Sequence, residues 1–111
     1  MEIREHREAG GIVLSIAGRM DAITTPTYEG KLHELIASGD TRVVIDFGSL
    51  DYISSAGLRA LLTTAKALKA AAGEVRFARI TGTVKDVFDI SGFGSIFPIY
   101  PTVADALASF T

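Results

Sequence analysis

The chain has 111 residues, of which 48% are hydrophobic and 22% are charged. That balance is typical of a folded core and not of a disordered segment. The net charge of −2 offers no basic surface for a nucleic-acid backbone or an anionic membrane. The lack of cysteine excludes disulfides, thiol catalysis and thiolate metal sites. We therefore expect one domain over residues 1–111, with no nucleic-acid and no membrane partner.

Nothing in the sequence directs the chain to a membrane. The segment Met1–Glu8 is charged and has no apolar block after it, unlike a secretory signal. No apolar run approaches the ~20 residues that a spanning helix needs. We expect a cytoplasmic protein. His6 and His33 lie far apart in the sequence, and neither is assigned a metal or general-base role.

The first part of the chain alternates between strand and helix patterns. Ile3–Glu8 and the β-branched run Gly11–Gly18 predict an antiparallel hairpin that turns near Gly10 and Gly11. Threonine caps and a proline at Thr24–Pro26 predict the start of a helix, which ends near Ser38–Gly39. The apolar run Arg42–Phe47 is typical of a strand buried on both faces of an α/β sheet.

The second part repeats this alternation. Helical spacing of apolar residues predicts a helix over Leu58–Ala72, and alternation predicts a strand over Glu74–Ile80. A third helix is predicted over Thr81–Ser91, a last strand over Ile96–Tyr100, and a short terminal helix over Val103–Phe110. The order β-β-α-β-α-β-α-β-α predicts an α/β fold, in which helices cover a mixed sheet largely on one side.

Two segments resemble enzyme sites but lack essential parts. Ser91–Ser95 is glycine-rich, yet it lacks the third glycine of a dinucleotide site, the lysine of a P-loop and a preceding strand. We interpret it as a helix C-cap followed by a turn. Asp46 and Asp51 lie near hydroxyls, but neither histidine is placed to activate a serine, and Ile53 stands where a nucleophile elbow needs glycine. We assign no catalytic residue, no metal and no cofactor.

The segment Leu50–Leu58, LDYISSAGL, places Ser54 and Ser55 between a strand pattern and a helix pattern. A serine just before an apolar helical stripe is typically an N-cap, whose oxygen accepts a backbone N–H and contributes ~1 kcal/mol. A cap accounts for one of these serines. The role of the second hydroxyl stays open on this reasoning.

The segment Val43–Leu58 resembles the signature of STAS domains, specifically the anti-sigma factor antagonists of bacterial partner-switching systems. In that pattern a strand, an aspartate and a short loop precede aspartate-serine-(serine, threonine or alanine)-glycine-leucine, which opens a helix. Gly18–Asp21 matches a second hallmark, and Ala104–Phe110 resembles the family's closing helix. The resemblance covers essentially the whole chain.

The resemblance implies a phosphorylation switch. Aligned on Gly57 and Leu58, the serine that anti-sigma kinases phosphorylate falls at Ser55, with Ser54 as second choice. Ser54 stands where the common pattern has aspartate, which removes one negative charge beside the acceptor. The unmodified protein is expected to bind an anti-sigma factor of the serine-kinase type, and the phosphorylated protein to release it. A PP2C-type serine phosphatase would reset the cycle, and ATP would belong to the kinase, so this chain is not expected to be an enzyme.

The partner-binding residues implied by the resemblance surround the acceptor. Ala56 and Gly57 would let another protein's backbone come close. The two aspartates Asp21 and Asp46 would rim the same surface; the alternative for each is a turn-forming or helix-capping aspartate. The expected partner-binding set is Asp21, Asp46, Ser54, Ser55, Ala56, Gly57 and Arg59.

Two further expectations concern assembly and alternatives. Asp51 is expected in a loop, and the protein is expected to be a monomer or weak dimer. The alternative function is a STAS scaffold or transport-accessory module without a phosphoswitch. An enzyme would instead show turnover or tight nucleotide binding.

Overall fold

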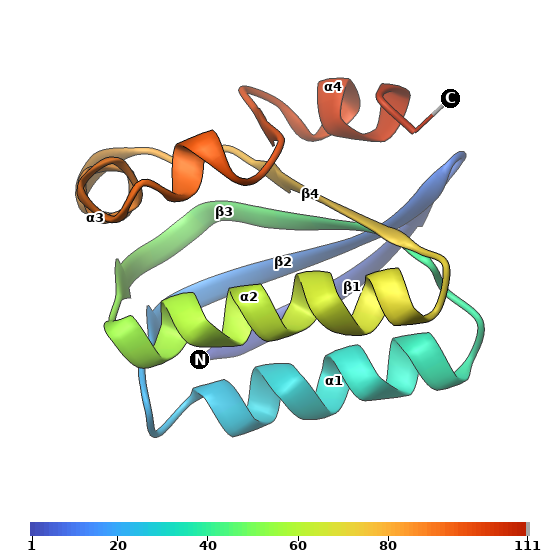
Figure 1. The fold of residues 1–111 in the computed structure, drawn as a ribbon, viewed down its shortest axis with the longest axis horizontal. Helices are drawn as coiled ribbons and strands as arrows, with labels where there is room; N and C mark the ends of the chain where they lie inside the picture. The colour runs from blue at the N-terminus through green and yellow to red at the C-terminus, as the bar shows by residue number, and fades with distance from the viewer. Residues whose placement is uncertain (111) are drawn as a thin grey trace.

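The computed structural model describes residues 1–110, which form a five-stranded sheet and four α-helices (Figure 1). Thr111, the last residue of the expected domain, lies outside the described residues. The predicted order β-β-α-β-α-β-α-β-α is confirmed. The elements are β1 (Glu2–Glu8), β2 (Gly11–Met20), α1 (Thr25–Ala37), β3 (Arg42–Ile53), α2 (Ser55–Ala70), β4 (Glu74–Ala78), α3 (Gly82–Ser91), a 3-10 helix (Phe93–Ser95), β5 (Ile99–Tyr100) and α4 (Val103–Ala108).

The strands lie in the order β1-β2-β3-β4-β5. β1 and β2 form the predicted antiparallel hairpin, in which Glu8 lies opposite Gly11. Its two-residue turn requires a positive φ at Gly10, which has φ +100°. The remaining neighbours are parallel, and each is connected through a helix. The sheet is therefore mixed, as expected.

The two faces of the sheet carry different layers. In the first half of β3, the odd-numbered residues Val43, Ile45 and Phe47 belong to one buried cluster together with residues of α1, α2 and α3. Val44 belongs to a second, smaller cluster with Ala106 of α4 and Phe110. Figure 1 shows α1 and α2 below the sheet and α4 above it. Coverage largely on one side is thus confirmed, with α4 on the opposite face.

β3 is twice as long as the predicted strand. The apolar run ended at Phe47, but the strand continues to Ile53. Its pairing with β2 contains two irregularities, at each of which β3 uses one residue more than β2. Such bulges break the alternation of buried and exposed residues, so the pattern could not show the continuation. Asp51 therefore lies on β3 and not in a loop.

Other boundaries shift less. α2 begins at Ser55 instead of Leu58. β5 contains only Ile99 and Tyr100, whereas a strand from Ile96 was predicted. The amides of Ile96 and Phe97 donate to the carbonyl of Phe93, so they are committed to the 3-10 turn and are not available to a strand ladder. Within residues 1–110, no helix combines the length and apolar character needed to cross a bilayer.

Candidate partner-binding site

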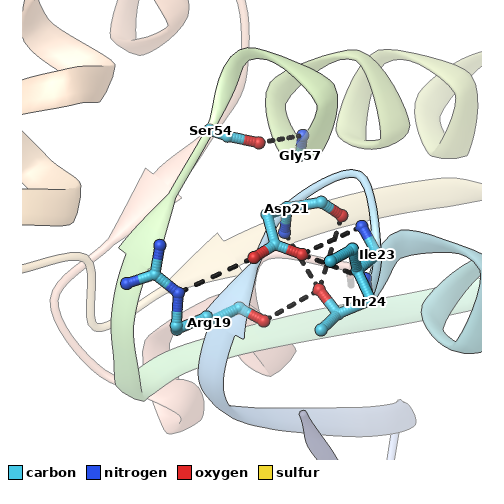
Figure 2. A network of polar contacts seen from close by, with 6 residues as sticks. All are labelled: Arg19, Asp21, Ile23, Thr24, Ser54 and Gly57. Carbon is cyan, nitrogen blue, oxygen red and sulfur yellow. Dashed lines mark hydrogen bonds and ion pairs between the residues drawn. The ribbon is translucent and has the colours of Figure 1, made fainter.

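The site forms where β2 and β3 end side by side. The last residues of the two strands, Met20 and Ile53, are partners in the parallel ladder. The Ser54 N–H then donates to the Met20 carbonyl at 2.9 Å. This bond holds the loop after β2 against the start of α2; Figure 2 shows Ser54 at that start and Asp21 in the loop. Residues 34 positions apart in the sequence, Met20 and Ser54, are thereby brought to one end of the sheet.

Ser54 is the N-cap of α2. Its backbone is extended, with φ −96° and ψ 176°, and its hydroxyl accepts a hydrogen bond from the Gly57 N–H at 3.3 Å. This bond satisfies one of the N–H groups that the first helical turn leaves without an intrahelical acceptor. The structural role expected for one of the two serines therefore belongs to Ser54.

Ser55 is the first residue of α2 and has an exposed side chain. Among the described residues, its hydroxyl has no hydrogen-bond partner. The hydroxyl lies at the positive end of the helix dipole, near N–H groups of the first turn. The structure thus separates the adjacent serines into a capping hydroxyl and a free one.

Gly57 has a different role from the one expected. It was predicted to let a partner's backbone come close, but it is buried inside the protein. A Cβ at this position would lie 2.7 Å from Ile53 Cγ1 and 2.9 Å from the Met20 carbonyl oxygen. Glycine is therefore needed because the first turn of α2 lies directly against the ends of β2 and β3. Ala56 is partly exposed beside it and remains available at the surface.

Asp21 closes the loop after β2. One of its carboxylate oxygens accepts the N–H groups of Ile23 and Thr24, at 3.0 and 3.1 Å, and Arg19 lies 3.6 Å from the other oxygen (Figure 2). The hydrogen bond from the Thr24 N–H is the largest of the effects that lower the pKa of Asp21, and burial opposes them. Asp21 therefore has the turn-forming role that was kept as its alternative, while lying next to Ser54.

Thr24 occupies the N-cap position of α1 without capping it. Its hydroxyl accepts the Asp21 N–H and donates to the Arg19 carbonyl, both at 2.9 Å. The predicted threonine cap is wrong in this respect, because the hydroxyl is turned back into the loop. Asp21 and Thr24 thus bond to each other's backbone and fix the loop in one conformation.

Three further residues at this end were not predicted to contribute. Ile23 is 87% exposed at the tip of the loop. The Arg19 guanidinium carbon lies 4.2 Å from the centre of the Tyr52 ring, its neighbour across the strands. The sequence did offer a signal for Ile23, because it is a large apolar residue between Asp21 and the start of a helix. The contact between Arg19 and Tyr52 depends on the bulges in β3 and has no sequence signal.

Arg59 lies one turn into α2 and is exposed. It lines a groove of 410 Å³ between the first turns of α1 and α2, together with Ala56 and Glu29. The structure therefore brings Asp21, Ser54, Ser55, Ala56 and Arg59 to one end of the molecule. We call this end, with Ile23, the switch surface.

Asp46 does not join the switch surface. It was expected at the end of its strand, but the bulges extend β3 by six residues beyond Phe47. Asp46 is 7% exposed and lies on the face of the sheet that α4 covers. Its carboxylate accepts the Gly48 N–H at 2.9 Å and contacts Ser15 and Arg79, each at 3.2 Å. These bonds fix the bulge at Gly48.

Comparison with known proteins places the chain in a family. A family model described as "STAS domain" matches residues 1–106. The chain belongs to the STAS domain family.

Within residues 1–110, no three or more metal-binding side chains are grouped so that they could hold a metal ion.

Relatives of this STAS protein carry regulatory names. BtrV of Bordetella bronchiseptica is 37% identical over 110 residues, which cover 99% of this chain and 95% of that protein. The anti-sigma-F factor antagonist RsfB of Mycobacterium tuberculosis is 31% identical over 98 residues, covering 88% and 80%. The crystal structure of an anti-sigma factor antagonist from Mycobacterium paratuberculosis has a TM-score of 0.87 and 26% identity, and the match covers 98% and 92% of the two chains.

Proposed function

We propose that this STAS protein is an anti-sigma factor antagonist that acts as a phosphorylation-controlled binding switch. With Ser55 unmodified it sequesters an anti-sigma factor that is also a serine kinase, and with Ser55 phosphorylated it releases that partner. A PP2C-type serine phosphatase restores the unmodified form. The proposal takes residues 1–111 as one domain acting in the cytoplasm, without a catalytic residue of its own. The names of the relatives support the class of partner.

The separation of the two serines is the observation that carries the proposal. A kinase must reach a hydroxyl and transfer phosphate to it, and Ser55 offers an exposed hydroxyl without a competing hydrogen bond. Ser54 is half-buried, and its hydroxyl holds the Gly57 N–H. Phosphate on Ser54 would disturb the cap of α2, whereas phosphate on Ser55 leaves the cap in place.

The position of Ser55 also favours a fold that survives modification. A phosphate adds a charge of about −1.5 to −2 and three acceptor oxygens. The N-terminus of a helix tolerates this charge because its N–H groups and the helix dipole favour an anion. The domain should therefore keep its structure in both forms.

A partner that covers the switch surface responds differently. Ile23 offers it an apolar anchor that is 87% exposed. Asp21 already supplies a negative charge, and hydrogen bonds to its carboxylate keep its pKa low. Phosphate on Ser55 would add a second negative charge at a packed contact, where a penalty of about 3 kcal/mol weakens binding more than a hundredfold.

Phosphorylation of the full chain tests the assignment directly. The protein is incubated with its cognate kinase and ATP, and the phosphate is located by mass spectrometry. We expect it on Ser55, also in the Ser54→Ala variant, and expect no incorporation into Ser55→Ala. Phosphate found on Ser54 alone, or on neither serine, would contradict the proposal.

Binding measurements test the switch itself. Ser55→Asp should unfold at the wild-type temperature yet bind the kinase about a hundredfold more weakly, because a carboxylate mimics part of the phosphate charge. Ser55→Ala should bind constitutively. If Ser55→Asp binds as tightly as the wild type, and phosphorylated wild type does the same, the electrostatic mechanism is wrong.

A further inference from the structure

The outer edge of β1 has no partner strand within residues 1–110. Six of its seven residues are exposed. In a two-residue hairpin the residues that flank the turn, here Glu8 and Gly11, form a hydrogen-bonded pair, and such pairs alternate along the ladder. The backbone groups of Ile3, Glu5 and Arg7 consequently point away from β2. An edge of this kind can accept another strand unless the protein prevents it.

Both faces of β1 carry charges of both signs. On the face toward α1, Glu5 pairs with Lys31 at 2.6 Å, and Arg7 forms two hydrogen bonds to Asp40, at 2.7 and 2.8 Å. On the opposite face lie Glu2, Arg4, His6 and Glu8. Native edge strands often use charges to repel other strands. Whether the charges of β1 repel or attract a second strand depends on which residues of the two strands lie opposite each other.

We infer that the edge of β1 pairs with β1 of a second copy of this chain, antiparallel and centred on His6. A twofold axis perpendicular to the sheet keeps each face continuous, so only residues of the same face meet. In this register Glu5 lies opposite Arg7 of the second copy, and Arg4 lies opposite Glu8 of the second copy. By symmetry each pair occurs twice. Four opposite-charge pairs therefore flank the axis, each stabilising by a small amount.

The neighbouring registers are less favourable. Centring the pair on Arg4, Glu5 or Arg7 places that charged residue opposite its own copy, which is destabilising. Centring on Ile3 pairs Glu2 with Arg4, but overlaps three strand residues instead of five. The register on His6 also makes Glu5 and Arg7, whose backbone groups point outward, the hydrogen-bonded pair. Registers centred on the other residues satisfy the same backbone condition, so the charges select the alignment on His6.

The ion pairs within one copy hold the side chains of Glu5 and Arg7 in position for this pairing. A groove of 440 Å³ along β1 is lined by Glu5, Arg7, Lys31 and Asp40. In the paired strands, Lys31 and Glu5 of one copy would lie in one row with Arg7 and Asp40 of the second copy, and the charges along this row would alternate in sign. The hairpin turn lies at the opposite end of β2 from Met20, so the switch surface stays uncovered (Figure 1).

A charge-exchange experiment tests the pairing. A single strand edge buries little area, so we expect weak association of the wild type that increases at low ionic strength. Arg4→Glu alone and Glu8→Arg alone each place like charges across the axis, and both should be monomeric in sedimentation. Their equimolar mixture places opposite charges at all four contacts and should recover association. A mixture that stays monomeric, or a wild type that stays monomeric at millimolar concentration and low salt, would overturn the inference.

Cysteine cross-linking tests the register. The chain contains no cysteine, so an introduced thiol can form a disulfide only with the same residue of a second copy. His6→Cys places two thiols on directly opposed positions, about 4.5 Å apart between Cα atoms, which suits a disulfide. Glu2→Cys is the matched control, because Glu2 forms none of the four charge pairs and its two copies would be offset by eight residues, ~26 Å along the strands. Oxidation should give covalent dimers of His6→Cys and not of Glu2→Cys; equal yields, or none for His6→Cys, would overturn the register.

Discussion

Two polar clusters, one at the end of β3 and one nearer its middle, each contain an aspartate, and the two aspartates have different roles. At the end of the strand, Asp21 is fixed in a loop by its neighbours, and the adjacent hydroxyl of Ser55 stays free at the surface. On the opposite face, Asp46 is buried, and its carboxylate is used up by Ser15, Gly48 and Arg79. A satisfied, buried network stabilises structure, whereas a rigid loop beside a free group can take part in binding. The first cluster is therefore the candidate switch, and the second a brace for the bulged strand.

Gly57→Ala gives the largest expected effect on the switch end. The added Cβ would meet Ile53 and the Met20 carbonyl at less than 3.0 Å, so α2 must shift, at a cost of about 3 kcal/mol. Thermal unfolding should show a lower midpoint. The matched control is Gly30→Ala in α1, where a Cβ meets nothing within 4 Å. The control should be neutral or slightly stabilising, and equal losses in both variants would contradict this role of Gly57.

Asp46→Ala tests the opposite cluster. Removing the carboxylate leaves the Gly48 N–H without its acceptor and Arg79 without its ion pair, which should cost about 2 kcal/mol in unfolding free energy. Denaturant titration measures this loss, and kinase affinity should remain within twofold of the wild type. A large loss of affinity in a folded variant would show that Asp46 acts in binding after all.

Ser54→Ala and Ser55→Ala sharpen the contrast between the two serines. Loss of the cap should cost about 1 kcal/mol in Ser54→Ala. Ser55→Ala removes a hydroxyl that has no partner within the described residues, so its unfolding free energy should match the wild type. Chemical denaturation of both variants checks the difference. Equal stabilities would mean that the Ser54 cap contributes nothing.

The smallest expected effect is the pH dependence that comes from Asp21. Hydrogen bonds lower its pKa in the folded protein, so the carboxylate stabilises the fold above the ordinary aspartate pKa of about 3.9. This contribution is lost as the pH falls through the lowered folded pKa. The stability difference between wild type and Asp21→Asn should therefore narrow on acidification below about pH 4. A difference that is constant with pH would contradict this.

Part of the site was predictable because its signals are local. The spacing in LDYISSAGL predicted a helix start with one capping serine, and the resemblance to STAS domains pointed to Ser55. The alternative of a turn-forming aspartate at Asp21 was also open from the sequence. The burial of Gly57 was not predictable, because the obstacle is Met20 on another strand. The same holds for Asp46, whose position depends on how β3 pairs with β2.

The element order, the hairpin turn and the helices could be predicted from the residues alone, because they depend on residue periodicity and on glycine, proline and serine at defined positions. Tertiary structure alone decided that β3 continues past Phe47, that α4 covers the opposite face, and that the loops after β2 and β3 meet. The physical reason is that bulges, faces and close approaches arise from pairing between segments distant in sequence, and such pairing leaves no periodic trace in either segment.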